Sequence, residues 1–302
     1  MKNIMITGAG GFLGREILSQ ADNHEDFSFY ALSSQTDKLK PILKHTGNIV
    51  LLPPADAERC FASTDFDCLV HAAFPRNYSG VDMARGLKYF ADILDMAVKN
   101  KVKNIINISS QSVYDQKRLA PANENTTLSL DSSYAVGKYS TELMINSVSR
   151  VIPCTNLRMA SLIGPDFDQR LTNKFVSSAI SGKDITIMDG RQRFGFLDVA
   201  DAASGILCIL SSNTDKWDTV YNLGTDESHS LSEIAKVVCD TAVEFGLPSI
   251  RIKTTEADLW QNSALDCGKI YRHFGWRAKK TLKDSIESIF AKKLNRGYVA
   301  AH

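Results

Sequence analysis

In the first half of the chain, short runs of apolar residues alternate with longer segments in which apolar residues recur at a helical period. The runs are rich in isoleucine, valine, leucine and phenylalanine, as are the buried strands of parallel sheets. We expect strands at residues 2–7, 27–32, 49–52, 67–73, 104–108 and 153–159, and helices that include residues 82–100 and 134–150. This alternation predicts an α/β protein built on a doubly wound parallel sheet.

The pattern becomes less regular after Gly164-Pro165. Residues 196–224 contain segments that should return to the sheet, whereas a helix near 173–181 and a strand at 185–188 should form a separate, smaller unit. The sequence therefore predicts a larger domain and a smaller α/β carboxyl-terminal domain, formed by residues 1–163 plus 196–224 and by residues 164–195 plus 225–302, respectively.

The first expected strand leads into a glycine-rich loop and then into a helical segment. The loop, residues 8–14, reads Gly-Ala-Gly-Gly-Phe-Leu-Gly. Glycines in this context permit a tight turn and let the pyrophosphate of a dinucleotide approach the helix N-terminus. We therefore predict that the larger domain is a Rossmann-type cofactor domain, in which the dinucleotide contacts Gly8, Gly10, Gly11, Phe12, Leu13 and Gly14.

The end of the second expected strand bears on which dinucleotide is bound. About 20 residues after the loop, an acidic residue would hold the ribose diol of NAD, but the chain has Ser33 and Ser34 at this place. Their hydroxyls can accommodate a 2′-phosphate, and Lys38 follows as a counter-charge. These residues favour NADP over NAD, while Asp37 keeps NAD open if the alignment is shifted.

Two later strand ends should reach the same edge of the sheet, because ligands of such sheets bind outside the carboxyl ends of the strands. The small residues Ala72 and Ala73 would let the backbone approach the cofactor. We interpret the neighbouring His71 as a packed strand residue. Ser109 and Ser110 end the fifth strand, and Ser109 is a further predicted cofactor contact.

A tyrosine and a lysine four residues apart begin the helix that follows. Side chains at i and i+4 lie on one face of a helix, so Lys138 can place its positive charge near Tyr134. A nearby cation favours the phenolate, so the phenol could donate or accept a proton near neutral pH. The spacing also occurs by chance on ordinary helices, so its meaning depends on the surrounding motifs.

Composition and charge narrow the class of protein. The chain has 302 residues, and its 35 Lys and Arg residues nearly balance 34 Asp and Glu residues, which argues against a nucleic-acid partner. No apolar run approaches the roughly 20 residues of a membrane span. The six cysteines are scattered without a Cys-x-x-Cys and the six histidines form no ligand pair, so we expect no disulfide framework and no metal. With no secretion signal after Met1, we expect a cytoplasmic protein.

Together these motifs resemble the extended short-chain dehydrogenase/reductases, in the NAD-dependent epimerase/dehydratase branch that acts on nucleotide sugars. The resemblance spans nearly the whole chain and rests on residues 7–14, 109–114, 134–138, 157–165, 196–201, 221–224 and 274–276. It implies hydride transfer between a nicotinamide and a sugar carbon. Tyr134 would exchange the proton of the reacting oxygen, and Ser110 would hydrogen-bond that oxygen. Lys138 would hold the nicotinamide ribose and lower the pKa of the phenol.

Departures from the family pattern restrict the reaction. Sugar 4,6-dehydratases of this branch carry an Asp-Glu pair directly after the serine or threonine, where this chain has Gln111 and Ser112. Without these carboxylates, elimination of water is disfavoured, and the missing Glu also disfavours the related decarboxylases. A 4-ketoreductase and a 4-epimerase remain, and the preference for NADP favours the ketoreductase, which consumes NADPH. Gln111 and Ser112 are predicted instead to contact the sugar.

Two further departures concern the nucleotide half of the substrate. Many relatives have an Asn where this chain has Ser161, and an Arg where it has Phe194. Arg191 and Arg193 lie nearby and could bind a diphosphate bidentately, so they and Ser161 are predicted substrate contacts. A carbonyl reductase of a non-sugar metabolite and a non-catalytic dinucleotide-sensing protein stay open. By analogy with the family, we expect a homodimer that pairs the helix preceding the fifth strand and the helix bearing Tyr134.

Overall fold

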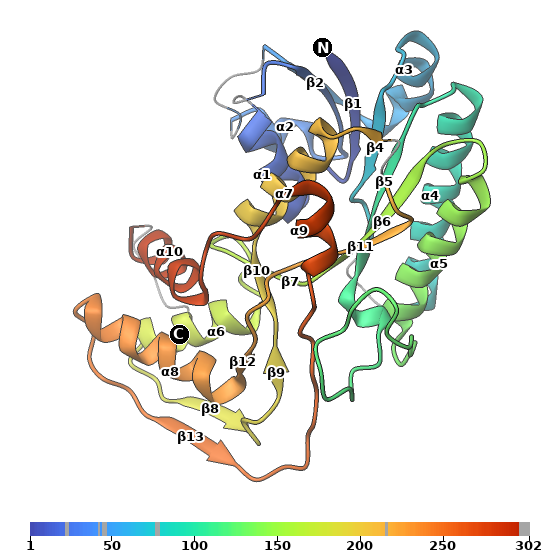
Figure 1. The fold of residues 1–302 in the computed structure, drawn as a ribbon. Coiled ribbons are helices and arrows are strands. Elements are labelled where there is room, and N and C mark those ends of the chain that lie inside the picture. The colour runs from blue at the N-terminus through green and yellow to red at the C-terminus, as the bar shows by residue number, and fades with distance from the viewer. Residues whose placement is uncertain (22–23, 42, 44–46, 76–78, 215–216, 296–302) are drawn as a thin grey trace.

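Figure 1 shows a computed structural model of the chain, which describes residues 1–302 except 22–23, 42, 44–46, 76–78, 215–216 and 296–302. Its centre is a seven-stranded sheet with the order β11-β6-β5-β4-β1-β2-β3, in which every neighbouring pair is parallel. The chain reverses its direction of travel between β1 and β4, so the predicted doubly wound sheet is confirmed. The strands are β1 (Lys2–Thr7), β2 (Phe27–Leu32), β3 (Ile49–Leu52), β4 (Cys68–His71), β5 (Ile105–Ser110), β6 (Cys154–Met159) and β11 (Val220–Leu223).

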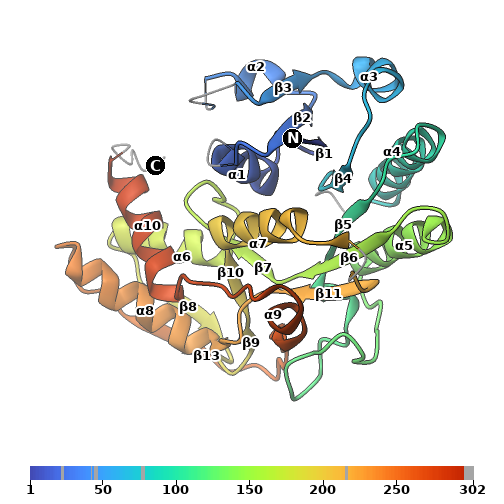
Figure 2. The same ribbon diagram turned by 45° about the horizontal axis from the view of Figure 1, so that its top comes forward.

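Helices cover both faces of the sheet (Figures 1 and 2). Successive side chains of a strand point to opposite faces, so Ile6 of β1 packs in one core cluster with Ile206, whereas Met5 packs in another with Phe90. A short α2 (Thr36–Leu39) follows β2. The first face carries α1 (Phe12–Gln20) and α7 (Val199–Ser211), and the second carries α3 (Ala57–Ser63), α4 (Gly80–Lys99) and α5 (Ser133–Val148).

The smaller carboxyl-terminal part lies beyond one end of the sheet (Figure 1). Its helices pack on one another around a separate apolar cluster that includes Phe175, Ile234 and Phe290. Three two-stranded sheets also lie outside the large sheet: β7 with β10, β9 with β12, and β8 with β13. These elements are β7 (Ser161–Ile163), α6 (Leu171–Ile180), β8 (Ile185–Met188), β9 (Arg193–Phe194), β10 (Phe196–Asp198), β12 (His229–Ser230), α8 (Leu231–Glu244), β13 (Ile252–Thr255) and α10 (Leu282–Asn295).

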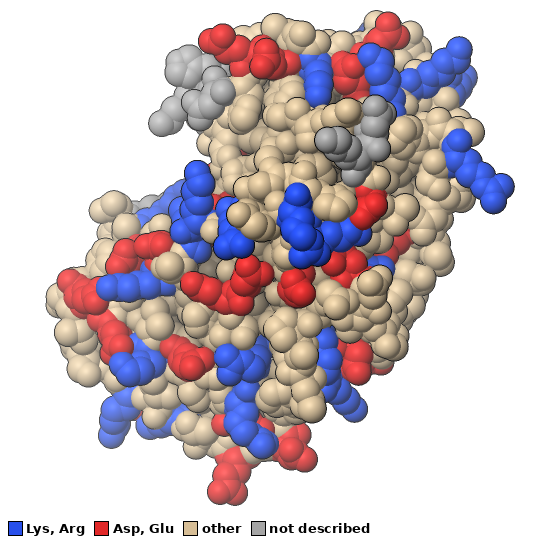
Figure 3. Space-filling model, in the orientation of Figure 1, with Lys and Arg blue, Asp and Glu red and all other residues tan. Residues whose placement is uncertain are grey.

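One carboxyl-terminal helix returns to the large sheet. The helix α9 (Gly268–Phe274) packs against β11, and Ile270 and Trp276 belong to the core cluster of the sheet. The predicted domain boundaries stay a prediction. No helix in the described part of the chain has the length and apolar content to cross a membrane. On the face drawn in Figure 3, basic and acidic side chains are interspersed.

Candidate active site

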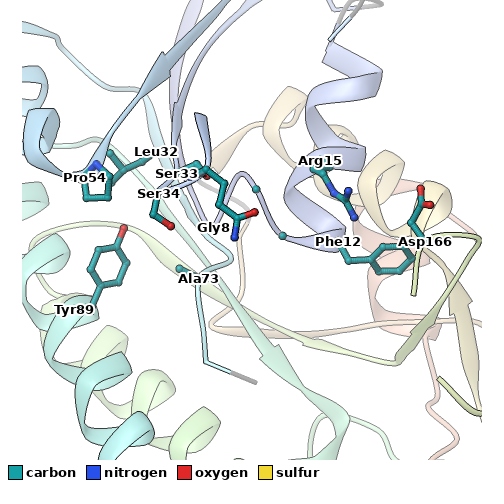
Figure 4. A pocket seen from close by; sticks show the side chains of 13 residues that line it. Gly8, Phe12, Arg15, Leu32, Ser33, Ser34, Pro54, Ala73, Tyr89 and Asp166 are labelled. Atoms are coloured by element: carbon teal, nitrogen blue, oxygen red, sulfur yellow. Dashed lines mark hydrogen bonds between the residues drawn. The ribbon is translucent and has the colours of Figure 1, made fainter. Parts of the chain in front are cut away.

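Two adjoining cavities open at the edge of the sheet where β1, β4 and β5 end. The first, of about 530 Å³, lies between the glycine loop, the end of β2 and Tyr89 of α4 (Figure 4). The second, of about 820 Å³, extends from the same loop to the ends of β5 and β6 and the start of α5. Because Gly8, Gly11 and Phe12 line both cavities, the two form one elongated site.

Most of the residues predicted from the sequence line this site. The roles themselves stay predictions, but the side chains come from six separate segments that the fold brings to one edge. The predicted residues that line one or both cavities are Gly8, Gly10, Gly11, Phe12, Leu13, Gly14, Ser33, Ser34, Ala72, Ala73, Ser109, Ser110, Gln111, Ser112, Tyr134, Lys138 and Ser161.

The glycine loop holds its backbone tightly against two neighbouring segments. Gly8 has a φ of +71°, and a Cβ placed on it would lie 2.7 Å from the backbone nitrogen of Ala73. A Cβ on Gly14 would clash with the carbonyl oxygen of Gly8. The following helix, α1, begins after Gly11 without a side-chain cap and without an acidic residue in its first turn. The first backbone N–H groups of a helix have no partner within the helix itself, so this helix start fits an anionic pyrophosphate.

The end of β2 presents hydroxyl groups to the first cavity. Ser33 and Ser34 line it together with Gln35, and the hydroxyl of Ser33 accepts a 3.0 Å hydrogen bond from the backbone N–H of Gln35. Figure 4 shows these serines on one side of the glycine loop and Arg15 of α1 on the other. Lys38 lies in α2 and is absent from the described residues that line either cavity.

The second cavity brings together the three predicted catalytic residues. Ser110 is the last residue of β5, and its hydroxyl oxygen accepts hydrogen bonds from the backbone N–H and the hydroxyl of Ser112, at 3.2 and 3.0 Å. The helix α5 begins at this cavity because Ser132 caps it, accepting a 3.1 Å bond from a backbone N–H of the first turn. Tyr134 thus occupies the first turn and Lys138 the next, both lining the cavity.

Lys138 is a buried cation. Its Nζ donates a 2.8 Å hydrogen bond to the carbonyl oxygen of Ile108 and lies 4.4 Å from the centre of the Phe74 ring. Burial lowers the pKa of Lys138 to about 7, and the negative charge of Glu142 opposes this effect. The ammonium form therefore predominates only up to neutral pH in this site.

A buried ionic cluster lies next to Lys138 along α5. It consists of Ser109, Glu142 and Arg158, and we call it the Glu142 cluster. The Glu142 carboxylate accepts a bidentate pair of bonds from Arg158, at 3.0 Å from Nε and 2.8 Å from Nη2. It also accepts a 2.5 Å bond from the Ser109 hydroxyl. Burial alone would lower the pKa of the Arg158 guanidinium, but its hydrogen bonds to the negatively charged Glu142 raise that pKa. The sequence analysis missed this cluster, although Glu142 stands one helical turn after Lys138 on the same face.

The residues that line the second cavity include some, but not all, of the predicted substrate contacts. Gln111, Ser112 and Ser161 line it as expected. The Oε1 atom of Gln111 is buried and has no hydrogen-bond partner within the described residues. Arg170, which the sequence analysis did not single out, also lines the cavity, with its guanidinium 4.5 Å from the centre of the Phe167 ring.

The two arginines predicted to bind a diphosphate lie elsewhere. The guanidinium of Arg191 is paired with Asp189, with bonds of 2.5 and 2.7 Å, in the turn after β8. Arg193 donates a 2.9 Å bond to the carbonyl oxygen of Ser228. Neither belongs to the described residues that line the second cavity, because both side chains are held by partners in the carboxyl-terminal part.

Comparison with protein families gives the ancestry of this site. The sequence model of the NAD dependent epimerase/dehydratase family matches residues 4–224, which include the glycine loop and all three predicted catalytic residues. The chain belongs to this family. The predicted resemblance is thereby confirmed, and with it the expectation that the chain belongs to a family of nicotinamide-dependent enzymes, while the preference for NADP stays a prediction.

Individual relatives of this family member are distant. The chain is 24% identical over 314 residues to a trifunctional UDP-glucose 4,6-dehydratase/UDP-4-keto-6-deoxy-D-glucose 3,5-epimerase/UDP-4-keto-L-rhamnose-reductase of Arabidopsis thaliana; the alignment covers 95% of this chain but 46% of the relative, about half its length. It is also 24% identical to the UDP-glucose 4-epimerase of Caenorhabditis elegans, with 95% and 96% covered. Among solved structures, UDP-glucuronic acid 4-epimerase from Bacillus cereus, in complex with UDP-glucuronic acid and NAD, superposes with a TM-score of 0.85 at 19% identity, covering 98% of this chain and 100% of that one. This likeness shows a shared fold.

Proposed function

We propose that the protein is an NAD(P)-dependent oxidoreductase that acts on a nucleotide-activated sugar, and more narrowly a 4-ketoreductase. The observation that carries this proposal is the meeting of Ser110, Tyr134 and Lys138 in a cavity that is continuous with the glycine-loop cavity. A nicotinamide cofactor, when bound, supplies or accepts the hydride. The protein then has to move one proton to or from the oxygen of the reacting carbon.

The three side chains divide this task. Tyr134 lines the cavity and is the proton donor to a carbonyl oxygen. Ser110, with its hydroxyl oxygen already accepting bonds from Ser112, has its proton available to hydrogen-bond the same substrate oxygen. Lys138 supplies a positive charge that favours the developing phenolate and would hold the ribose hydroxyls of the cofactor.

The lining of the second cavity argues against water elimination. No Asp or Glu is found among the described residues that line it, and the positions directly after Ser110 are the neutral Gln111 and Ser112. A dehydratase needs an acid and a base to remove a hydroxyl and a proton from adjacent carbons. The cavity offers groups for hydrogen bonding a sugar in place of that acid-base pair.

A 4-epimerase is the second candidate, because the Caenorhabditis elegans relative that aligns over nearly its full length carries that activity in its name. One experiment separates the two. Purified protein is incubated with NADPH or NADH and a UDP- or dTDP-linked 4-keto-6-deoxy sugar, and oxidation of the cofactor is followed at 340 nm. A ketoreductase consumes one cofactor per sugar reduced. Interconversion of UDP-glucose and UDP-galactose by protein that already carries NAD, without net turnover of the cofactor, would identify an epimerase.

We infer from the end of β2 that NADPH binds more tightly than NADH. Ser33 and Ser34 line the first cavity at the place where NAD-binding proteins have an acidic residue. A carboxylate there would repel the 2′-phosphate of NADPH, whereas the serine hydroxyls do not. Replacing Ser33 or Ser34 with Asp should therefore weaken NADPH binding at least tenfold and strengthen NADH binding, as measured by fluorescence titration of each cofactor. Tighter binding of NADH than of NADPH by the wild-type protein would overturn this preference.

Arg170 is the cationic residue that we expect to bind the substrate's phosphate groups. It lines the second cavity beside Phe167, whereas Arg191 is paired with Asp189 outside it. Replacing Arg170 with Ala should abolish most of the thermal stabilisation that saturating UDP or dTDP gives, because a charge-assisted contact is worth about 1.5–3 kcal/mol. Arg191→Ala is the matched control and should respond like wild type. If Arg191→Ala lost as much of the stabilisation by UDP or dTDP as Arg170→Ala, phosphate binding could not be assigned to Arg170 in place of Arg191.

We further propose a homodimer formed through α4 and α5. These helices lie side by side on one face of the sheet, and the outward side of α5 exposes Val136 and Leu143, the latter 51% exposed. Exposed apolar side chains on a helix such as α5 suit a self-complementary interface. A Leu143→Glu substitution should shift the protein from dimer to monomer in gel filtration with light scattering. A monomeric wild type at micromolar concentration would contradict the proposal.

A further inference from the structure

The surroundings of Lys138 contain one buried acid that the reaction scheme leaves unused. Glu142 is 2% exposed and stands one helical turn after Lys138 on α5. Its carboxylate is fixed by two bonds from Arg158 of β6 and one from Ser109 of β5. The Glu142 cluster therefore ties together the helix that carries Tyr134 and Lys138 and the strand that carries Ser110.

The charged and titratable groups around Lys138 come from three elements, α5, β6 and β4. On α5 these are Tyr134 and Glu142, and β6 contributes Arg158 through its pair with Glu142. On β4, burial and then the charge of Lys138 lower the pKa of His71 to about 3, so the imidazole is neutral at physiological pH. β5 contributes only the carbonyl of Ile108 to the ammonium group, within the described contacts.

Within the described residues, Glu142 is the one charged group found to act on Lys138, and no charge of the neighbouring helix α4 does so. At Gly137 of α5, a Cβ would meet the side chains of Met83, from α4, and of Phe74. Glu142 is thus the acid whose negative charge acts on the ammonium group from inside the protein. Arg158 reduces that effect, because it places a positive charge on the other side of the same carboxylate.

We propose that Glu142 is a positioning residue for the reaction: held by Arg158 and Ser109, its carboxylate keeps Lys138 a cation in a buried site and fixes the Ser110 strand to the Tyr134 helix. This role rests on the proposed function of Lys138. Arg158 sets the strength of the effect, since a free carboxylate would hold the cation more strongly than a paired one. Because Glu142 and Arg158 have opposite charges, their removal should shift the pKa of Lys138 in opposite directions. A purely structural role of the pair would not produce such opposite shifts.

The test is the ionisation of Lys138 in single and double variants. Lysine labelled with ¹³C at Cε is incorporated, the Lys138 resonance is assigned with Lys138→Met, and its pH midpoint is measured by NMR in the full chain as purified. Glu142→Gln should lower the midpoint by about one pH unit, because an opposite charge is lost. Arg158→Met should raise it, and the double variant should lie near wild type.

A purely structural role predicts a different result. All variants would then lose stability while the Lys138 midpoint stayed in place, and that outcome overturns the proposal. If Glu142→Gln alone fails to fold, with Arg158 buried and unpaired, the comparison of Arg158→Met with the double variant still decides, because removal of Glu142 must lower the midpoint there as well. The measurement uses no substrate, so it is independent of whether the cofactor-oxidation assay detects the proposed reduction.

Discussion

Replacing Tyr134 with phenylalanine is expected to lower turnover by on the order of 10²–10⁴-fold, which is the usual contribution of a positioned acid or base. Tyr134 lines the second cavity at the first turn of α5, and its hydroxyl is the proposed proton donor. Its ring lies edge-on to Phe74, with 5.9 Å between the ring centres, and a phenylalanine ring can keep this packing. The loss should therefore appear in kcat, while the affinity for NADPH stays within a few fold.

Tyr139 provides the matched control for this prediction. It lies on the same helix, is partly buried against the core of the sheet, and does not belong to the described lining of either cavity. Tyr139→Phe should retain nearly full turnover. Cofactor oxidation at 340 nm and circular dichroism of both variants make the comparison. Full activity in Tyr134→Phe would remove the proposed acid and would favour a non-catalytic role for the cofactor site.

The sheet could be predicted from the sequence because buried parallel strands are nearly continuous apolar runs. The predicted bounds of the strands at residues 2–7, 27–32 and 49–52 agree with β1, β2 and β3. Strand order then follows from the general behaviour of α/β folds, which brings the glycine loop and Ser110 to one edge. In the carboxyl-terminal part, the strand predicted at residues 185–188 agrees with β8. The pairing of β9 with β12 was missed, because two-residue pairings depend on tertiary contacts and leave no periodic pattern.

The site was less predictable wherever a side chain's partner is remote in the sequence. The pair of Glu142 with Arg158 spans two elements, so neither residue alone indicates a buried ion pair. For Arg191 the reason is different: the diphosphate prediction relied on proximity along the chain to the family motif, whereas the guanidinium is bound locally by Asp189, two residues away. Arg170 reaches the cavity only because the loop before α6 folds back over Phe12, with 4.8 Å between the Phe12 and Phe167 rings.

Lys138→Met is expected to make the protein more stable and inactive at the same time. Burial lowers the pKa of Lys138 from its ordinary value of 10.5 to about 7. Between these two pH values the unfolded chain binds a proton that the folded protein does not, so wild-type stability should rise with pH across this window. Below about pH 7 the folded wild type must bury the charge. At pH 6 the variant should therefore be more stable by on the order of 5 kcal/mol, at about 1.4 kcal/mol for each unit of a pKa difference.

This gain should shrink as the pH rises from 7 toward 10.5. Over this range Lys138 is protonated in the unfolded chain and neutral in the folded protein, and the free energy needed to remove that proton falls as the pH approaches 10.5. Urea unfolding of both proteins at pH 6 and pH 9 measures the change, and Lys174→Met, at an exposed position of α6, is the control that should show no such pH dependence. Turnover of Lys138→Met should fall at least 100-fold at pH 6, where the wild type carries the ammonium group, because the cation beside Tyr134 is lost. A variant that is less stable than wild type at pH 6 would mean that the ammonium group is held so well by Ile108 and Glu142 that its burial carries no cost. Stability and catalysis are then opposed at this one side chain, as expected where a charge is retained in a buried site for its chemistry.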